Sequence, residues 1–445
     1  MNTSDTIIAQ ATPLGFSGVA VIRMSGPKSF SIIKKLTKAK SFKSRQATLE
    51  KIVNKKMNVV DDALITFFPG PESYTGEDVV EISCHGNPVI VEEIVLLGTS
   101  FGARIAEPGE YTKRAFLNGK VDLIQAEGIM ALIEAKSIES VYAQQKIITG
   151  NLSNKVAEIK TSVVNILSLL ENEMDISEDV SSKETIVEID KSISNLINTT
   201  KELIQSHKVG HYLCSGVSVV ITGKPNVGKS TLLNQIVGSE RAIVSKTPGT
   251  TRDIVDCEIK LCGVPVRLID TAGIRESKNE IEKKGIKLAL KRAEDADLNI
   301  VIIEPKSPDF AGFLNDLVSE KSIFVLNKSD LGFKDLNKKF KKFKPISISL
   351  KDEKNIDQLI LEIKNKLKNK FINSEDILIT RERHRQNLEQ CVYHLKKFEE
   401  KNKFDDFDKA AEDLRLAARH LGIIVGKVDV EEILGSIFND FCIGK

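Results

Sequence analysis

One short stretch constrains the fold more than any other part of the sequence. Residues 223–230 (GKPNVGKS) fit the pattern GxxxxGK[ST]; they follow the apolar run Val217–Thr222 and precede the helical segment Thr231–Val237. A glycine-rich turn between a strand and a helix points backbone N–H groups at phosphate oxygens, while its lysine adds positive charge and its serine hydroxyl binds Mg²⁺. The sequence therefore predicts a nucleotide-binding α/β domain.

The residues on both sides of this loop alternate between apolar runs and helical segments. Strands separated by crossover helices form a parallel, doubly wound sheet. We expect such an α/β unit over residues 211–370. Its expected strands are Val217–Thr222, Val264–Ile269, Leu298–Ile303, Ile323–Leu326 and Pro345–Ile348.

Three short motifs follow the phosphate loop in the order typical of GTP-binding domains. Gly249–Arg252 (GTTR) offers a threonine to Mg²⁺, and Asp270–Gly273 (DTAG) offers an aspartate to a Mg²⁺-bound water and an N–H to the γ-phosphate. Asn327–Asp330 (NKSD) closes an expected strand. The Asp330 carboxylate can accept hydrogen bonds from N1–H and the 2-amino group of guanine, a pair that adenine lacks. The ordered set predicts GTP as the nucleotide.

A common catalytic side chain is absent after the DTAG motif. Ile274 stands where signalling GTPases carry a glutamine that orients the attacking water. Isoleucine cannot orient water, so efficient hydrolysis needs another positioning residue or an extra cation. The downstream acids Glu276, Glu280 and Glu282 are candidates, and each is equally compatible with helix-surface charge.

The rest of the chain has two other patterns. Residues 1–118 mix short β-like runs with helical stretches and Gly/Pro turns, which predicts an α+β domain. In residues 119–210 and again in residues 371–445, apolar side chains recur at helical spacing. Both helical regions need a partner for their apolar stripes. We therefore expect them to form one all-α domain into which the α/β unit is inserted.

Composition narrows the functional classes. The 445 residues suggest about three domains, and 41% hydrophobic content excludes a disordered chain. With 64 Lys+Arg against 62 Asp+Glu, the net charge of +2 argues against nucleic-acid binding by bulk charge. The apolar runs are shorter than the ~20 residues that a bilayer span needs. Sparse cysteines and no secretory pattern at Met1–Gln10 lead us to expect a cytoplasmic protein.

Motifs outside the α/β unit carry a family resemblance. They are Asp5–Pro13 (DTIIAQATP), Tyr74–Asp78 (YTGED), Ala106–Thr112 (AEPGEYT) and Phe441–Lys445 (FCIGK). With them, the chain resembles the MnmE (TrmE) family of tRNA-modification GTPases, within the TrmE-Era-Septin-like P-loop GTPases, over nearly its whole length. The resemblance implies a tetrahydrofolate-binding and dimerisation domain at residues 1–118, a helical domain in two parts, and an inserted GTPase domain.

The resemblance also implies roles in the GTP site. Mg²⁺ is expected at Ser230 and Thr251. The family's GTPase modules dimerise across the nucleotide when K⁺ is bound, and Glu282 matches the family's catalytic glutamate, which acts on the attacking water. The expected K⁺ ligands are Asn226, Ser245, Thr247 and Thr250. The expected nucleotide contacts are Asn226, Val227, Gly228, Lys229, Ser230, Thr231, Ser245, Lys246, Thr247, Pro248, Gly249, Thr250, Thr251, Asp270, Thr271, Ala272, Gly273, Asn327, Lys328 and Asp330.

A tetrahydrofolate site is implied in the N-terminal domain. Arg23, Glu81 and Lys120 match the family's folate positions, and Lys445 contributes from the C-terminal motif. A glutamate can pair with the 2-amino and N3–H edge of a pterin, while lysines and arginines suit the glutamate tail of folate. Cys442 matches a thiol associated with the family's modification chemistry.

As a whole, the resemblance implies a homodimeric, K⁺-activated GTPase. With a flavin-dependent, FAD-carrying partner (MnmG, also called GidA), it would form a heterotetramer that modifies the wobble uridine of certain tRNAs. The pair would add an aminomethyl-type group (carboxymethylaminomethyl) at carbon 5, using 5-formyl- or 5,10-methylene-tetrahydrofolate and GTP hydrolysis. No membrane takes part.

Two other functions stay open at this point. A ribosome-assembly GTPase would share the motifs between residues 217 and 351, but it needs neither folate ligands nor a terminal thiol. A folate-dependent enzyme with a vestigial nucleotide site is opposed by the complete motif set. Residues 331–370, with twelve lysines against five acids, could contact tRNA phosphates or form a solvated face. His207, His211 and Cys214 have a metal-ligand spacing but lack a fourth ligand.

Overall fold

The computed structural model describes most of the chain. Residues outside the description are 1–4, 40, 176–182, 225, 240–255, 262, 271–290, 292, 305–318, 332–343, 372–378, 402–406, 429–436, 439–440, 442–443 and 445. The chain divides into two compact units. The first comprises residues 1–133, 146–197 and 387–445, and the second comprises residues 134–145 and 198–386.

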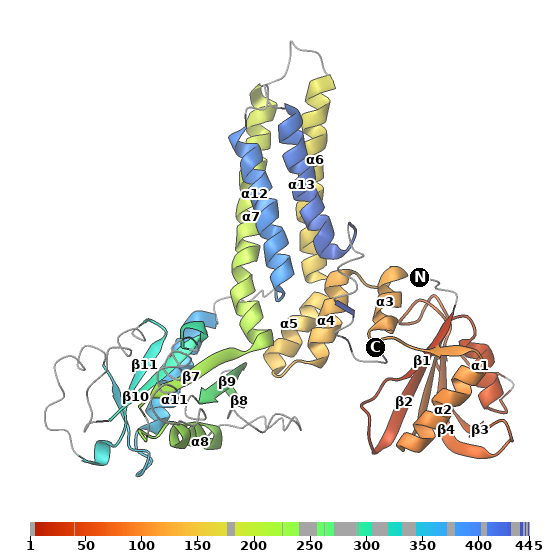
Figure 1. Ribbon diagram of the computed structural model, residues 1–445. Coiled ribbons are helices and arrows are strands. Elements are labelled where there is room, and N and C mark those ends of the chain that lie inside the picture. The colour runs from red at the N-terminus through yellow and green to blue at the C-terminus, as the bar shows by residue number, and fades with distance from the viewer. Residues whose placement is uncertain are drawn as a thin grey trace, which may run out of the picture. The chain divides into compact units, whose positions relative to one another are not determined.

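The N-terminal part of the first unit is a mixed sheet with helices on one face (Figure 1). Its strand order is β3-β4-β5-β2-β1-β6, antiparallel except for the parallel pair β1–β6. The strands are β1 (Thr6–Gln10), β2 (Ser17–Ser25), β3 (Thr48–Val53), β4 (Val59–Phe68), β5 (Val79–Gly86) and β6 (Ala103–Ile105). With the helices α1 (Ser29–Leu36) and α2 (Pro88–Ser100), this sheet confirms the expected α+β domain.

Strand alternation separates the core of this domain from its other face. Ile22 and Met24 of β2 and Ile82 of β5 are fully buried in the cluster that α1 and α2 complete. Successive side chains of a strand point to opposite faces, so Arg23 and its register partner Glu81 lie on the face away from this core. The apolar core therefore lies on one face of the sheet, and the Arg23–Glu81 pair lies on the other face.

Between and after the two sheet domains the described chain is mainly helical. These helices are α3 (Glu110–Leu117), α4 (Leu123–Ile133), α5 (Ile138–Ile148), α6 (Asn151–Asp175), α7 (Lys183–Ser215), α12 (Glu382–Glu400) and α13 (Phe407–Val425). α6 packs along α13 (Figure 1), and Arg415 of α13 bonds Glu171 of α6 at 2.8 Å. Ser194 of α7 donates to Glu399 of α12 at 2.6 Å. Helices from before and after the α/β unit therefore form one all-α domain, as expected.

A buried polar cluster links α12 and α13. The Asp413 carboxylate, 5% exposed, bonds His394 Nδ1 at 2.8 Å and also pairs with the Lys401 ammonium. The rings of His394 and His420 stack with centroids 5.8 Å apart. Because a buried carboxylate needs its partners, this cluster specifies how the two helices pair.

The second unit contains the expected parallel sheet. Its strand order is β12-β11-β10-β7-β9-β8. The strands are β7 (Val217–Gly223), β8 (Asp256–Leu261), β9 (Val264–Asp270), β10 (Leu298–Ile303), β11 (Ser322–Leu326) and β12 (Ile346–Ser347). Neighbouring strands are parallel except for the antiparallel pair β8–β9, which adds an edge strand to the five that the sequence predicts.

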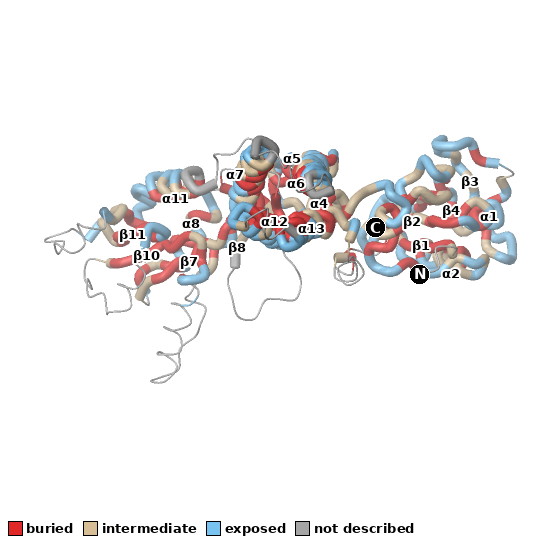
Figure 2. Tube along the Cα trace, turned by 90° about the horizontal axis from the view of Figure 1, so that it is seen from above, coloured by how far each residue is buried: buried red, intermediate tan, exposed pale blue. Residues whose placement is uncertain are grey.

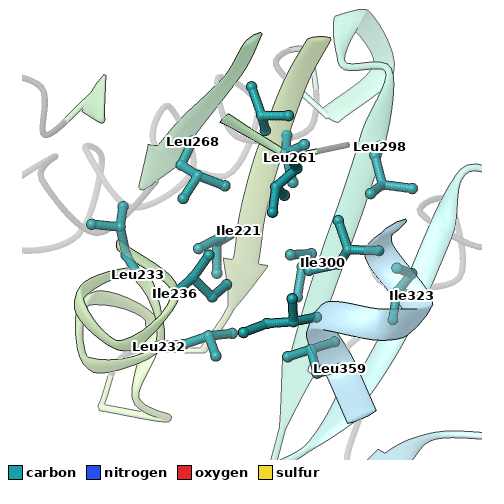
Figure 3. Packing of buried hydrophobic residues seen from close by; sticks show 14 of the residues in the cluster. Ile221, Leu232, Leu233, Ile236, Leu261, Leu268, Leu298, Ile300, Ile323 and Leu359 are labelled. Carbon is teal, nitrogen blue, oxygen red and sulfur yellow. The ribbon is translucent and has the colours of Figure 1, made fainter. Parts of the chain in front are cut away.

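Alternate apolar side chains of the strands, which share one face of this sheet, form a core cluster with the helices that cover that face. Leu232, Leu233 and Ile236 of α8 (Lys229–Ser239) pack toward Ile221 and its neighbouring strands, as Figure 3 shows. Leu359 of α11 (Ile356–Phe371) joins the same cluster. The packing fixes where α8 begins, and therefore where the phosphate loop ends.

In two places the second unit differs from the domain bounds expected from the sequence. α7 continues to Ser215, beyond residue 210, and ends at Gly216, whose φ of +81° suits glycine. Residues 134–145 pack with this unit: Lys136 pairs with Glu258 of β8 at 2.6 Å, and Glu139 pairs with Lys260 at 3.4 Å. The domain boundaries at residues 118, 210 and 370 stay a prediction.

In the part of the chain that the structure describes, no helix combines the length and the apolar character required to cross a bilayer.

Candidate functional site

The phosphate loop has a backbone that demands glycine at two positions. Gly223 ends β7 with φ of +156°, and Gly228 precedes α8 with φ of +105°. A Cβ atom would lie 2.5 Å from the Ile302 carbonyl oxygen at the first position and 2.6 Å from Asn327 Nδ2 at the second. Between them Asn226 has φ of +62° and an exposed side chain. The loop therefore wraps tightly, with Asn226 at its surface.

Lys229 is the buried cation of this loop. It is 7% exposed, and its Nζ donates to the carbonyl oxygens of Gly223 and Lys224, both at 2.9 Å. Lys229 also opens α8, so the helix N-terminus and the ammonium lie at one place. The two following residues, Ser230 and Thr231, are exposed in the first turn of α8. This concentration of positive potential suits a phosphate chain.

Asn327 ties the guanine-recognition motif to the phosphate loop. It follows β11, is 3% exposed, and its Nδ2 donates to the Val227 carbonyl at 2.7 Å. The Leu350 N–H donates to its Oδ1 at 3.2 Å. Both ends of the amide are therefore satisfied, and three loops are held together by one side chain.

The rest of the NKSD motif lies beside this link. Lys328 Nζ donates to the Asn226 carbonyl at 3.3 Å and forms an ion pair with Glu304. Asp330 is exposed, and Ser349 Oγ donates to its Oδ1 at 3.0 Å. Ser349 is fully buried and sequence reasoning missed it, because it lies in a different loop with no motif of its own.

Other expected residues of the GTP site cannot be placed. β9 ends at Asp270, whose side chain is not described. The expected residues outside the described part of the chain are Ser245, Lys246, Thr247, Pro248, Gly249, Thr250, Thr251, Thr271, Ala272, Gly273 and Glu282. Their roles stay predictions.

In the N-terminal domain, Arg23 and Glu81 form a fork-like ion pair. They are register partners on β2 and β5, and Glu81 Oε1 accepts from Arg23 Nη2 at 2.7 Å and from Nε at 2.9 Å. The Arg23 guanidinium lies 5.6 Å from the ring centroid of Tyr74 and 5.7 Å from that of Tyr111. The structure thus adds two aromatic residues that sequence reasoning did not assign to the site, although both lie within the family motifs.

The two tyrosines are held as neutral hydrogen-bonding groups. Tyr111 donates its hydroxyl to the Arg23 carbonyl at 2.6 Å, and burial raises its pKa. The Tyr74 hydroxyl bonds Thr112 Oγ1 at 2.8 Å, and burial raises the pKa of Tyr74 as well. Both hydroxyls stay protonated, so they frame the Arg23–Glu81 pair without adding charge.

Lys120 holds the loop that carries Tyr74. Its Nζ donates to the Pro71 carbonyl at 2.9 Å, and Asn118 Nδ2 donates to the Thr75 carbonyl at 2.7 Å. Lys120 is exposed. Lys120 therefore bonds the same loop whose Tyr74 ring lies beside the Arg23 guanidinium.

The C-terminal motif reaches the same domain. A Cβ at Gly444 would lie 2.2 Å from the Gln10 carbonyl oxygen, so Gly444 packs directly against the end of β1. Gln10 pairs with Ile22, the neighbour of Arg23. Cys442 and Lys445 lie outside the described residues.

The histidines at the end of α7 have protein partners. His207 Nε2 lies 3.6 Å from a Glu382 carboxylate oxygen, its ring stacks on His211, and burial lowers its pKa. Cys214 accepts from Gln144 Nε2 at 2.8 Å. Across the described residues, no group of three or more His, Cys, Asp or Glu side chains could hold a metal ion.

Comparisons with known proteins cover the whole chain. A family model described as "MnmE helical domain" matches residues 123–442, and one described as "GTP-binding protein TrmE N-terminus" matches residues 6–120. The chain is 49% identical over 446 residues to the tRNA modification GTPase MnmE of Pelagibacter ubique, covering 99% of this chain and 100% of that protein. It is 39% identical over 459 residues to the same-named protein of Natranaerobius thermophilus, covering 100% of each. A solved structure of an Aquifex aeolicus Era variant bound to GDP and AlF4⁻ is similar at 25% identity, with a TM-score of 0.26 over 40% of this chain and 66% of that chain.

Proposed function

The chain belongs to the MnmE family of tRNA-modification GTPases, and from that premise we propose how it works: as a K⁺-activated homodimer with a flavin-dependent partner. It is a GTPase that acts in tRNA modification. Together with the FAD-carrying partner MnmG (GidA), in a heterotetramer in the cytoplasm, it adds a carboxymethylaminomethyl-type group at carbon 5 of the wobble uridine. A 5-formyl- or 5,10-methylene-tetrahydrofolate supplies the carbon.

The hydrogen bond between Asn327 and Val227 supports the GTP-binding part of this proposal. It joins the loop that recognises guanine to the loop that surrounds the phosphates, and the buried Lys229 ammonium lies in that second loop. This arrangement supports GTP as the ligand, because the groups proposed to meet the base and the phosphates are held by one hydrogen-bonded unit.

Two metal ions belong to the proposed mechanism. Ser230 and Thr251 would hold Mg²⁺, while Asn226, Ser245, Thr247 and Thr250 would hold K⁺. The Asn226 side chain is exposed at a φ of +62°, so its amide oxygen is accessible to a weakly hydrated cation, and the Asn226 carbonyl accepts a hydrogen bond from Lys328 Nζ. When bound, K⁺ supplies positive charge beside the transferring phosphoryl group. Glu282 orients the attacking water.

The proposed folate site is the Arg23–Glu81 pair and its surroundings. Glu81 can accept from the pterin edge, and the rings of Tyr74 and Tyr111 give the flat cofactor an aromatic border. Lys120 and Lys445 bind the glutamate tail, and Cys442 provides a thiol beside the one-carbon unit. The packing of Gly444 against Gln10 supports this assignment for the C-terminal motif.

Exposed apolar side chains support a homodimer through the N-terminal domain. In the β1–β2 connection Leu14 is 90% exposed and Phe16 is 87% exposed, and the register partners Leu49 and Leu64 are exposed on β3 and β4. Large apolar side chains exposed to this degree favour burial against another chain. A second copy of this chain is the proposed occupant.

Nucleoside analysis of tRNA tests the function. Cells lacking this protein should accumulate wobble uridine without the carbon 5 group, and the intact chain should restore it while Lys229→Ala should not. Unchanged wobble nucleosides in the deletion strain would reject the proposal. GTP turnover in KCl and NaCl, with Glu282→Ala beside the wild type, tests the K⁺ assignment, which equal rates in both salts would overturn.

A further inference from the structure

The N-terminal domain contains a strongly basic segment. Residues 28–56 include ten Lys and Arg residues and one acid, Glu50, a local net charge of +9 in a chain whose total is +2. Two of these cations are already paired, Lys51 with Asp62 and Arg45 with Glu72. Several others have no such partner, and the fold gathers them.

Lysines of α1 and its N-cap and a lysine of the β3–β4 turn lie close to Phe101 and Gly102. Lys35 of α1 has its Nζ 5.4 Å from the Phe101 ring centroid, and Lys55, in the turn between β3 and β4, has its Nζ 5.7 Å from the same centroid. Lys28 Nζ lies 3.6 Å from the Cβ position of Gly102. Lys34 extends over Phe30 of α1, 4.5 Å from its ring centroid.

We call Lys28, Lys34, Lys35 and Lys55 the basic patch. All four side chains are exposed, and among the described residues no carboxylate lies within ion-pair distance of any of them. Both views place α1 and β3 beside each other, and Figure 2 shows exposed residues along both. Like charges gathered without acids destabilise a fold slightly, which favours an external anion as their counterpart.

The patch lies on the helix side of the sheet. α1 covers the face of Ile22 and Met24, whereas Arg23 and Glu81 belong to the opposite face. An anion on the patch therefore leaves the proposed folate site accessible. The rings of Phe30 and Phe101 are partly buried against the core, so they orient ammonium groups rather than stack on bases.

We propose that the basic patch binds the phosphate backbone of tRNA. This rests on the proposed function, which makes tRNA the substrate. Lysine ammonium groups are point charges that neutralise phosphates without reading bases, and several of them spread over one surface match a chain of evenly spaced phosphates. The patch thus positions the tRNA, while specificity lies elsewhere.

The test is tRNA binding by the full chain at several salt concentrations. The variant Lys35→Gln/Lys55→Gln should lower affinity for unmodified tRNA about tenfold at 0.1 M salt and reduce the slope of log affinity against log salt by about 1 per lysine. The control Lys51→Gln/Lys155→Gln removes the same charge from lysines that pair with Asp62 and Glu158, and its affinity should stay within about twofold of the wild type.

Each contrary result overturns the proposal: equal affinity and slope in the patch variant, equal loss in the control, or no salt-dependent tRNA binding by the wild type. Binding to phosphatidylglycerol vesicles through the patch, without tRNA binding, would assign it to membranes instead. GTP turnover should be unchanged in both variants, which verifies their folding. If the patch binds tRNA but deletion leaves wobble nucleosides unchanged, the patch stands and the proposed function fails.

Discussion

Asn327 donates its side-chain amide to the main-chain carbonyl of Val227 at 2.7 Å, so the end of β11 and the phosphate loop after β7 are one hydrogen-bonded piece. The same amide accepts from the Leu350 N–H, which adds a third loop. In a MnmE-family GTPase this geometry joins the loop that we propose to recognise the base to the loop that we propose to surround the phosphates.

Replacing Asn327 should weaken GTP binding and the fold together. Asn327→Ala leaves the Val227 carbonyl and the Leu350 N–H without partners in a buried site, at a cost of about 1–3 kcal/mol. Asn327→Asp keeps the acceptor but turns a carboxylate toward the Val227 carbonyl, so its loss should be at least as large. Titration with a fluorescent GDP analogue and thermal unfolding measure both effects. Wild-type nucleotide affinity in Asn327→Asp would contradict the coupling.

Two glycines of the same loop and helix should respond in opposite ways to alanine. In Gly228→Ala the new Cβ would lie 2.6 Å from Asn327 Nδ2 at a φ of +105°, so nucleotide binding should fall at least tenfold. Gly238, in α8, has no atom within 4 Å of its Cβ position, so Gly238→Ala should stabilise the helix by about 0.5–1 kcal/mol. Equal nucleotide affinity in both variants would show that the close approach does not matter.

Glu81→Gln should reduce binding of 5-formyl-tetrahydrofolate. The variant loses the negative charge that faces Arg23 and keeps only one acceptor oxygen, for which Arg23 and the pterin edge would compete. Affinity should therefore fall at least tenfold in a calorimetric titration. Asp62→Asn is the control, since it breaks an exposed cross-strand pair with Lys51 that has no tyrosine rings beside it. A similar loss in both variants would indicate a general weakening of the sheet.

Acid should destabilise the helical domain through Asp413. Burial by itself raises the pKa of this carboxyl, but hydrogen bonds from Lys401 and His394 outweigh it and hold the pKa below its usual 3.8. A lowered folded-state pKa stabilises the protein above pH 4, and this contribution is lost as the pH falls below 4 through the folded-state value.

The corresponding variant is Asp413→Asn. It should cost about 1–3 kcal/mol at pH 7 and flatten the acid limb of the melting temperature measured by circular dichroism. Glu412→Gln changes an exposed carboxylate one residue earlier in α13 and should leave that limb intact. An unchanged acid limb in Asp413→Asn would remove Asp413 from the explanation.

Much of the α/β fold could be predicted because its information is local. The buried strands Leu298–Ile303 and Ser322–Leu326 are apolar except for Asn299 and Ser322, which is typical of parallel strands with both faces covered. The edge strand β8 has no such run, since it alternates with the charged residues Glu258 and Lys260. Those charges pair with Lys136 and Glu139, more than a hundred residues earlier, and no local pattern encodes that partnership.

The candidate site also combines residues that local motifs predict with residues that only the fold brings together. The phosphate loop and the NKSD motif are compact in sequence, so their residues could be named, and the structure joins them through Asn327. Ser349 beside Asp330, and Tyr74 and Tyr111 beside Arg23, come from distant segments and required the fold. The lysines of residues 28–56 form no sequence motif, and only the fold brings Lys35 and Lys55 to the same aromatic ring, that of Phe101.

The pairing of α6 with α13 has a consequence for synthesis on the ribosome. Glu171 and its partner Arg415 are 244 residues apart in the chain. At about 5–20 residues per second, α6 leaves the ribosome roughly 10–50 seconds before α13 exists. During that interval α6, whose Val163, Ile166 and Leu170 are buried in the finished protein, lacks the helix that it packs along. The pairing of α6 with α13 therefore forms only after the whole GTPase module between them has been synthesised.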